Sequence, residues 1–377
     1  MRTIIQILIF TLMSSYALHA QQTLYYSSGT SMEGRIVDIE GGEEGQIKTL
    51  MQGNKPYTSD RKRLLMVFNN VGNYLVIKNI SEDASQAKKQ VENFYSEKGN
   101  ATNNDVLFKG IPQEVIPCKI SAVLDEVVNY QTLDGKPASI KKDELLAIIF
   151  RDGKHLILKD FEEVVDNLSE MYSDFARLRS SKKQETVQNT NIPQKQINSI
   201  ENLPSSPKPV VKERKELTTE EQKIAKAKSK DKIEDLRILL NDIIDNNRSR
   251  DEKNKAIEKA VKMFTKDATV EVASINNPNI KNKRTVKEYL ERLSRLKYSS
   301  VSITYADVNF VQDFALDENG NYWGMATYSQ VFEAGSMKDI TKKNQKVKLQ
   351  PYSKIVEGTI LEKYEVLLGD IQVEVKQ

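Results

Sequence analysis

Two stretches of this sequence match each other at an offset of 81 residues: KPYTSDRKRLLMVFNNVGNYLVI at 55–77 and KPASIKKDELLAIIFRDGKHLIL at 136–158. Each begins with a Lys-Pro turn, continues into an apolar run, reaches a glycine (Gly72 or Gly153) and ends in a second short apolar run. Short apolar runs divided by turn residues are typical of β-strands. Because the apolar and turn positions agree along the whole unit, we interpret the pair as a tandem duplication.

Further strand starts precede each copy, at 35–39 and 119–123. A few short antiparallel strands must close on themselves or pack on a partner to bury one face and hide their edges. We therefore expect a mostly β N-terminal part with two small barrel-like units, at 21–80 and 105–179, or one barrel built by both. A helical connector at 81–104 separates the units, and periodic apolar residues predict a helix at the end of unit two.

The second copy carries a more specific pattern. Its segment KDELLAIIFRDG at 142–153 resembles the close of a small repeated β-module of exported proteins in Bacteroidetes-type bacteria. The first copy departs from that pattern, with RKR at 61–63 in place of the acidic residues. The resemblance implies a β-module and carries no known chemistry.

Residues 1–20 have the pattern of a secretory signal: Arg2, an apolar stretch of about ten residues, and small residues up to Ala20. That stretch is too short for a membrane span, which needs about twenty residues. We expect cleavage near Ala20 and a mature protein that is periplasmic or secreted and does not span the membrane. The single cysteine, Cys118, excludes an intramolecular disulfide.

Residues 180–217 combine low apolar content with four prolines, a composition that predicts a flexible linker. The 56 basic and 53 acidic residues are interspersed, so no nucleic-acid partner is indicated. The remaining segment, 218–377, reads as helix, helix, strand, helix and three long strand regions. Thr218 or Thr219 with Glu221 or Gln222 predicts a capping box at its start, and the nearly all-polar stretch up to Lys232 indicates a charged, solvent-exposed helix. Asn319-Gly320 is a hairpin turn between two of those strand regions.

That order of elements, with the step FTKDATVEV at 264–272 from helix to strand, resembles the nuclear transport factor 2-like superfamily. The resemblance implies an α+β cone at 218–377, in which three helices pack on a curved antiparallel sheet around a cavity. The superfamily includes both enzymes and pure binding domains, so the fold alone does not decide the function.

Few residues are available for catalysis or metal binding. His155 is the only histidine after the predicted signal, and it lies outside 218–377. One cysteine and one histidine are too few for a zinc site, and we expect no metal and no cofactor. Cys118 follows a proline at a strand start, where a buried structural thiol is the simpler interpretation than a reactive one.

An isomerase-like site in the cone remains as an alternative. Isomerase-like members of the resembled superfamily use a carboxylate base with Tyr or protonated Asp donors in an apolar cavity. The candidate groups, none of them fixed by a motif, are Tyr305, Asp307, Tyr328, Glu333 and Glu357. Strand alternation predicts that Tyr305 and Asp307 share one face of their strand.

The aromatic cluster in this half is the candidate ligand-binding surface: Tyr322, Trp323, Met325 and Tyr328. Such side chains line ligand cavities and interfaces, although core filling is the simpler alternative. We predict an exported, non-catalytic binding protein with two tethered modules. Its partner would be an unidentified protein or a small apolar ligand, with a possible homodimer through the C-terminal sheet. The alternative is a small-molecule-binding or isomerase-like enzyme.

Overall fold

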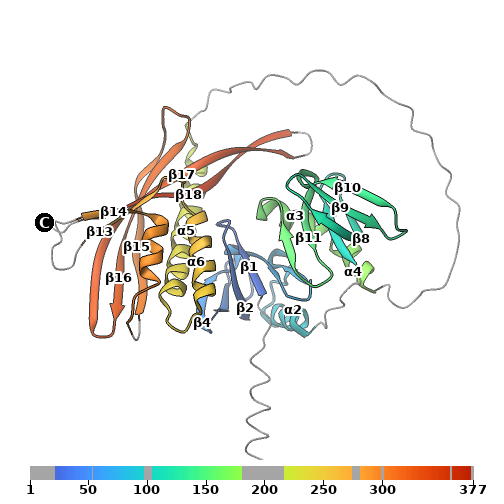
Figure 1. Ribbon diagram of the computed structural model, residues 1–377, viewed down its shortest axis with the longest axis horizontal. Coiled ribbons are helices and arrows are strands. Elements are labelled where there is room, and N and C mark those ends of the chain that lie inside the picture. Colours follow the sequence, from blue (N-terminus) through green and yellow to red (C-terminus); the bar gives the residue numbers. More distant parts are fainter. Residues whose placement is uncertain are drawn as a thin grey trace, which may run out of the picture.

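The computed structural model describes residues 22–52, 54–96, 104–180, 216–273, 281–298, 301–356 and 359–374. Within them the protein is mostly β, with three six-stranded sheets and six α-helices (Figure 1). The predicted signal at 1–20 lies outside the described residues, as does 181–215 of the predicted linker.

Unit one is a single sheet with the strand order β4-β3-β2-β1-β5-β6. Its strands are β1 (Gln22–Tyr26), β2 (Ser31–Ile39), β3 (Gln46–Met51), β4 (Lys55–Asp60), β5 (Leu64–Phe68) and β6 (Tyr74–Val76). Helix α2 (Ala84–Ser96) follows and covers one face with Ala87, Val91 and Phe94. The prediction of a β-rich unit is confirmed. Strands β4 and β6 are the two edges of this hydrogen-bonded order, which therefore does not show the closed barrel that was predicted.

Unit two has the same topology, with the order β10-β9-β8-β7-β11-β12. Its strands are β7 (Asp105–Lys109), β8 (Glu114–Val123), β9 (Val127–Thr132), β10 (Pro137–Lys141), β11 (Leu145–Ile149) and β12 (His155–Ile157). Two helices, α3 (Phe161–Glu170) and α4 (Tyr172–Ser180), replace the single helix expected there. The Asp160 carboxylate accepts a hydrogen bond from Glu162 N and begins α3.

The two units pack face to face through equivalent segments. One buried cluster combines β5 and β6 of unit one with β7, β11, α3 and α4 of unit two. The matching turns meet as well, because a Cβ on Gly153 would lie 2.0 Å from the Asn70 carbonyl oxygen, and Gly72 approaches Ile149. Both glycines have positive φ, +78° and +86°, which an L side chain rarely adopts.

Aromatic contacts across this interface follow the same equivalence. Tyr25 Oη lies 2.6 Å from His155 Nε2, and Phe68 stacks on the His155 ring. At the corresponding positions, with the two units exchanged, Phe108 of unit two packs edge-on against Tyr74 of unit one. His155 therefore packs within the contact between the units, where partial burial lowers its pKa to about 4.

The C-terminal part combines three helices with the third sheet, whose order is β14-β13-β18-β17-β16-β15. The helices are α5 (Thr219–Ile244), α6 (Arg250–Lys262) and α7 (Val286–Leu293); the strands are β13 (Thr269–Ala273), β14 (Lys281–Thr285), β15 (Val301–Leu316), β16 (Tyr322–Ala334), β17 (Met337–Val356) and β18 (Thr359–Glu374). The predicted capping box of Thr218 and Glu221 is present at the start of α5. The sheet is not wholly antiparallel as predicted, because β13 pairs in parallel with β18.

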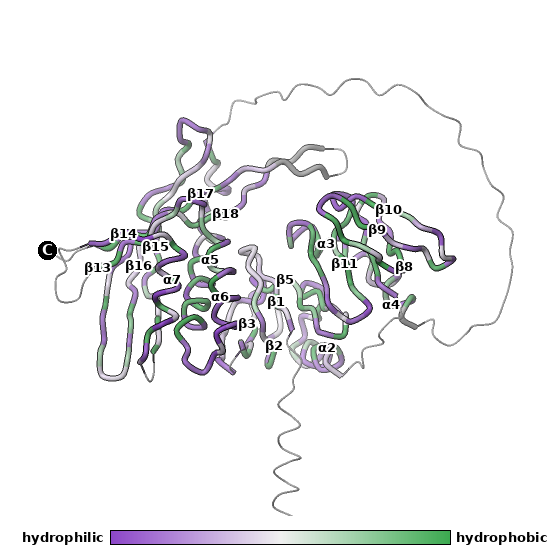
Figure 2. Tube along the Cα trace, in the orientation of Figure 1, coloured by the Kyte–Doolittle hydropathy of each residue, from purple (hydrophilic) through white to green (hydrophobic). Residues whose placement is uncertain are grey.

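Helix α5 contacts the core of the C-terminal part and unit one at once. Most of its buried residues face the third sheet, while Ile238 belongs to the unit-one cluster. The alternating hydropathy along α5 in Figure 2 is that of a helix whose apolar face is buried. In Figure 1 unit one lies between α5 and α6 on one side and unit two on the other, so the three parts form one row.

The turn contact predicts a large difference between two glycine variants. Gly153→Ala and Gly135→Ala both place a side chain at positive φ, +86° and +84°, but the Cβ at residue 135 meets nothing within 4 Å. Each variant carries the backbone strain of about 1–2 kcal/mol, and only Gly153→Ala adds a clash of about 1–3 kcal/mol with the other unit. Chemical denaturation should show the larger loss for Gly153→Ala; equal losses would contradict the turn contact.

The partly buried imidazole of His155 predicts acid sensitivity. The His155 pKa lies near 4 in the folded protein and near 6.5 when unfolded, so the unfolded state binds the extra proton as the pH falls below 6.5. Folding stability should drop by up to about 3 kcal/mol between pH 6.5 and 4, at 1.36 kcal/mol per pKa unit. In His155→Gln, the free energy of unfolding should fall less over this range, and an unchanged pH dependence would exclude this assignment.

Candidate functional site

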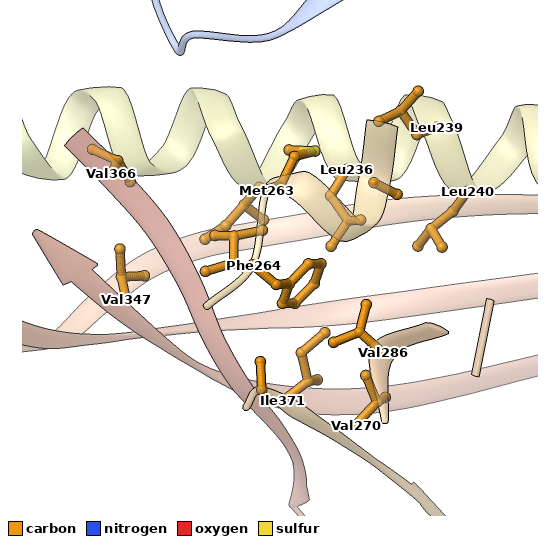
Figure 3. Packing of buried hydrophobic residues seen from close by; sticks show 14 of the residues in the cluster. Leu236, Leu239, Leu240, Met263, Phe264, Val270, Val286, Val347, Val366 and Ile371 are labelled. Atoms are coloured by element: carbon orange, nitrogen blue, oxygen red, sulfur yellow. The ribbon is translucent and has the colours of Figure 1, made fainter. Parts of the chain in front are cut away.

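The space between the C-terminal helices and their sheet, where the cone cavity was predicted, is filled by side chains. Figure 3 shows Phe264 and Met263 among residues of α5 and the sheet, with Val270, Val286 and Ile371 closing the interior. The cavity that remains within these described residues measures about 10 Å³. That volume accommodates about one water molecule.

The predicted catalytic residues do not converge on this space. The rings of Tyr305 and Tyr328 are tilted, with centroids 4.5 Å apart; Tyr328 is buried in the core, and the partly buried Tyr305 packs against it and lines the small cavity. Asp307 is exposed, because a bulge between Ala306 and Asn309, with φ +56° at Asp307, interrupts the alternation that would have placed it beside Tyr305. Glu333 is exposed at the far end of β16 and pairs with Lys338. Glu357 lies outside the described residues.

The predicted ligand-binding cluster divides between the two faces of β16. Tyr322 and Tyr328 are buried in the helix–sheet core, whereas Trp323 and Met325 alternate onto the other face. The Trp323 indole donates a hydrogen bond to Asp317 Oδ2 at 3.0 Å, and Lys348 lies 5.9 Å from the indole centroid. These four residues therefore do not form a common surface.

One ionisable group does face the filled core. Lys343 lies opposite Tyr328 on β17, lines the small cavity and is buried, and burial lowers the pKa of its ammonium to about 8. Nearby Asp339 and Glu271 partly oppose this shift. With about 10 Å³ beside it, this amine has no room for an organic substrate.

A much larger space lies where the three parts of the protein meet. We call it the junction cleft; its volume is about 610 Å³, within the range of small-molecule sites. Four segments form its walls: the β1–β2 turn of unit one at 27–29, the start of α3 in unit two at 159–162, one face of α5, and the strands β17 and β18. Figure 1 shows the β17–β18 hairpin extending from the third sheet above unit one.

Apolar and aromatic side chains cover much of the junction cleft. The α5 face contributes Ile224 and Ala225, unit two contributes Phe161, and the third sheet contributes the apolar residues Leu349 and Val366 together with Tyr352 and Tyr364. Ile224 is 50% exposed although it is apolar. A concave surface with an apolar lining and a few placed polar groups is typical of a ligand site.

Ion pairs connect unit two to the C-terminal part along the cleft. Glu162 accepts a hydrogen bond from Lys228 Nζ on α5 at 2.6 Å and lies 3.5 Å from Lys363 Nζ on β18. These two ammonium groups hold the pKa of Glu162 below its ordinary value although burial acts to raise it. A single carboxylate of unit two therefore contacts two elements of the C-terminal part.

Lys232 is the most buried cation of the cleft. Its side chain is 5% exposed, and its ammonium donates to the Val366 carbonyl oxygen at 2.6 Å. Burial lowers the pKa of this ammonium, and Glu365 and Asp235 partly offset the effect. Lys232 lies one turn from Lys228 on the face of α5 that lines the cleft.

Beside the cleft, a buried ion pair fixes unit one on α5. Arg63 donates to Asp235 Oδ1 at 2.8 Å, and its Nε lies 2.9 Å from Asp231 Oδ1. Ser28, in the turn that lines the cleft, also donates to the Asp235 carboxylate. Asp235 is fully buried, and the loss of hydration raises its pKa although Arg63 acts in the opposite direction.

Sequence reasoning did not find the junction cleft, because its residues are far apart in the chain. The only local signal is on α5, where Glu221, Ala225, Lys228 and Lys232 recur at helical spacing within a segment we had interpreted as a charged solvent-exposed helix.

Among the described residues, no group of three His, Cys, Asp or Glu side chains is arranged to hold a metal ion. No helix in the described ranges is long and apolar enough to cross a membrane.

Comparison with known proteins adds little. No family model and no curated protein matches this chain. Among solved structures, a putative scytalone dehydratase from Novosphingobium aromaticivorans matches with a TM-score of 0.23 and 10% identity, covering 42% of this chain and 89% of that one. At that TM-score the similarity assigns neither a fold nor an activity to this protein.

Removing one partner of the buried pair should destabilise the interface strongly. Arg63→Met leaves the Asp235 carboxylate buried without its cation, which costs about 3–5 kcal/mol in such pairs. The neighbouring Lys62 forms an exposed pair with Glu44, so Lys62→Met should change stability by less than about 1 kcal/mol. Chemical denaturation of both variants measures the difference; an Arg63→Met protein as stable as Lys62→Met would show that the pair is not a constraint.

Proposed function

We propose that this chain is an exported, non-catalytic binding protein whose ligand site is the junction cleft. The observation that carries the proposal is the contrast between two spaces: about 610 Å³ in the cleft and about 10 Å³ in the helix–sheet core. Of these two spaces, only the cleft has room for a ligand of ordinary size. Its lining of apolar side chains with a few lysines and carboxylates is suited to holding a molecule in one orientation.

The alternative of an isomerase-like enzyme has less support. Such chemistry needs a carboxylate in an apolar cavity close to a hydrogen-bond donor. Asp307 and Glu333 are solvent-exposed, while Tyr305 and Tyr328 lie in a packed core. We therefore favour binding by the cleft over turnover in the cone, and we propose no catalytic residue.

Two family-level interpretations belong to this proposal. The common strand order of the two N-terminal sheets, together with the 81-residue sequence offset, supports a duplicated β-module. The order of helices and strands after residue 218 supports a domain of the nuclear transport factor 2-like type. We propose that these modules act together, because the cleft takes walls from all three parts.

The export part of the proposal follows from residues 1–20, with cleavage near Ala20 and a periplasmic or secreted mature protein. The ligand would reach the cleft in that compartment, either as a free molecule or as part of a protein partner. A homodimer through the C-terminal sheet would use the face that carries Trp323 and Met325 and would leave the junction cleft open.

A neutral apolar probe tests the site directly. N-phenyl-1-naphthylamine should fluoresce on binding to the mature protein, and Ile224→Trp should abolish most of the signal because the indole fills the cleft. Ile340→Trp is the matched control, since Ile340 is similarly exposed, 55% against 50%, and does not line the cleft. If the wild type gives no signal, or if both variants respond alike, the junction cleft is not the ligand site.

A further inference from the structure

The Lys232 ammonium has N–H donors that its hydrogen bond within the protein does not use. An ammonium has three N–H donors, and here a backbone carbonyl, Val366 O, accepts one of them. Within the described part of the chain, no carboxylate lies close enough to Lys232 to form an ion pair with it. A cation that is 5% exposed and lacks a directly paired anion is costly to bury. An anion that enters the cleft would remove that cost.

The remaining charges of the cleft limit how many negative charges the ligand can carry. Lys228 and Lys363 already contact Glu162, and Glu221 is engaged in the capping box of α5. The lining contains four lysines and four acidic residues, so the cleft has no excess positive charge for a polyanion. Lys232 therefore matches a ligand with a single negative charge.

The apolar lining indicates the rest of the ligand. Ile224 lies two helical turns before Lys232 on the same face of α5, a distance of about 12 Å along the helix axis. Leu349 and Val366 face this part of α5 from the sheet, and Phe161 closes the side formed by unit two. An extended hydrocarbon chain along that wall would bury apolar surface from the C-terminal part and unit two at once.

We propose that the junction cleft binds a single-chain amphiphile with one carboxylate group. The carboxylate accepts a hydrogen bond from the Lys232 ammonium, and the hydrocarbon chain lies on Ile224 and Phe161. This inference rests on the proposed function, in which the cleft is the ligand site. Because the walls belong to three parts, the bound chain would also contact unit two and the C-terminal part together.

The test compares two probes that differ only in the head group. Dodecanoate and dodecan-1-ol are each titrated against the mature protein loaded with N-phenyl-1-naphthylamine, and displacement gives their dissociation constants. A hydrogen bond to a charged group contributes about 1.5–3 kcal/mol, so dodecanoate should bind at least about tenfold more tightly. In Lys232→Met this preference should disappear, whereas Lys230→Met, an exposed lysine on another face of α5, should retain it.

Each outcome identifies what has failed. Equal affinity of the acid and the alcohol for the wild type, or an unchanged preference in Lys232→Met, would overturn the carboxylate assignment while leaving the cleft as a site for neutral apolar ligands. No binding of N-phenyl-1-naphthylamine would instead overturn the proposed function. The comparison of acid and alcohol on the wild type needs no variant, so it stands even if a substitution at Lys232 prevents folding.

Discussion

The ion pair of Arg63 with Asp235 is the constraint on which the junction cleft depends. The two residues are 172 positions apart, one immediately before β5 in unit one and the other on α5. Because Asp235 is fully buried, separating unit one from α5 would expose its carboxylate to water or leave it buried without its cation. Ser28 and Ile238 strengthen the same contact, one with a hydrogen bond and the other by entering the unit-one core. Unit one is thereby held on the helix that also forms the floor of the cleft.

Unit two is held on unit one because the two units pack through equivalent surfaces. Equivalent strands, turns and aromatic residues of the two units face each other, with Tyr25 against His155 and Phe108 against Tyr74. Because equivalent residues face each other, the same packing arrangement occurs on both sides of the contact. It also presents the start of α3 to the C-terminal part, where Glu162 meets Lys228 and Lys363. The cleft is thus a consequence of how the three parts are joined.

Much of the fold could be predicted from the sequence, because it follows from local patterns. Turn glycines, apolar runs and the capping residue Thr218 indicated the strands, the repeat and the start of α5. Strand β14 was missed because its sequence, KNKRT, has no apolar residue, a composition that suits an edge strand. Alternation on β16 already separates Tyr322 from Trp323, so the division of the aromatic cluster was available from the sequence. The bulge at Asp307 was not, because nothing near it in the chain marks it.

The candidate site could not be predicted in the same way. Arg63 belongs to the RKR segment that departs from the acidic pattern of the repeat, and Lys232 lies in a long run of charged residues. In both cases a segment more than a hundred residues away in the chain contacts the buried cation. Local spacing cannot show such a partner. The sequence does show the amphipathic face of α5. That face lines a cleft only when unit one and β18 are packed beside it.

The central claim is that the three parts form one fixed arrangement rather than modules that move independently. Spin labels at Lys136 in unit two and Lys287 on α7, both exposed positions, allow pulsed electron paramagnetic resonance to measure the distance between the two ends of the molecule, and the buried Cys118 should not compete for the label. The account predicts a single narrow distance distribution in the mature wild-type protein. A broad distribution, as for domains joined only by a flexible linker, would contradict it.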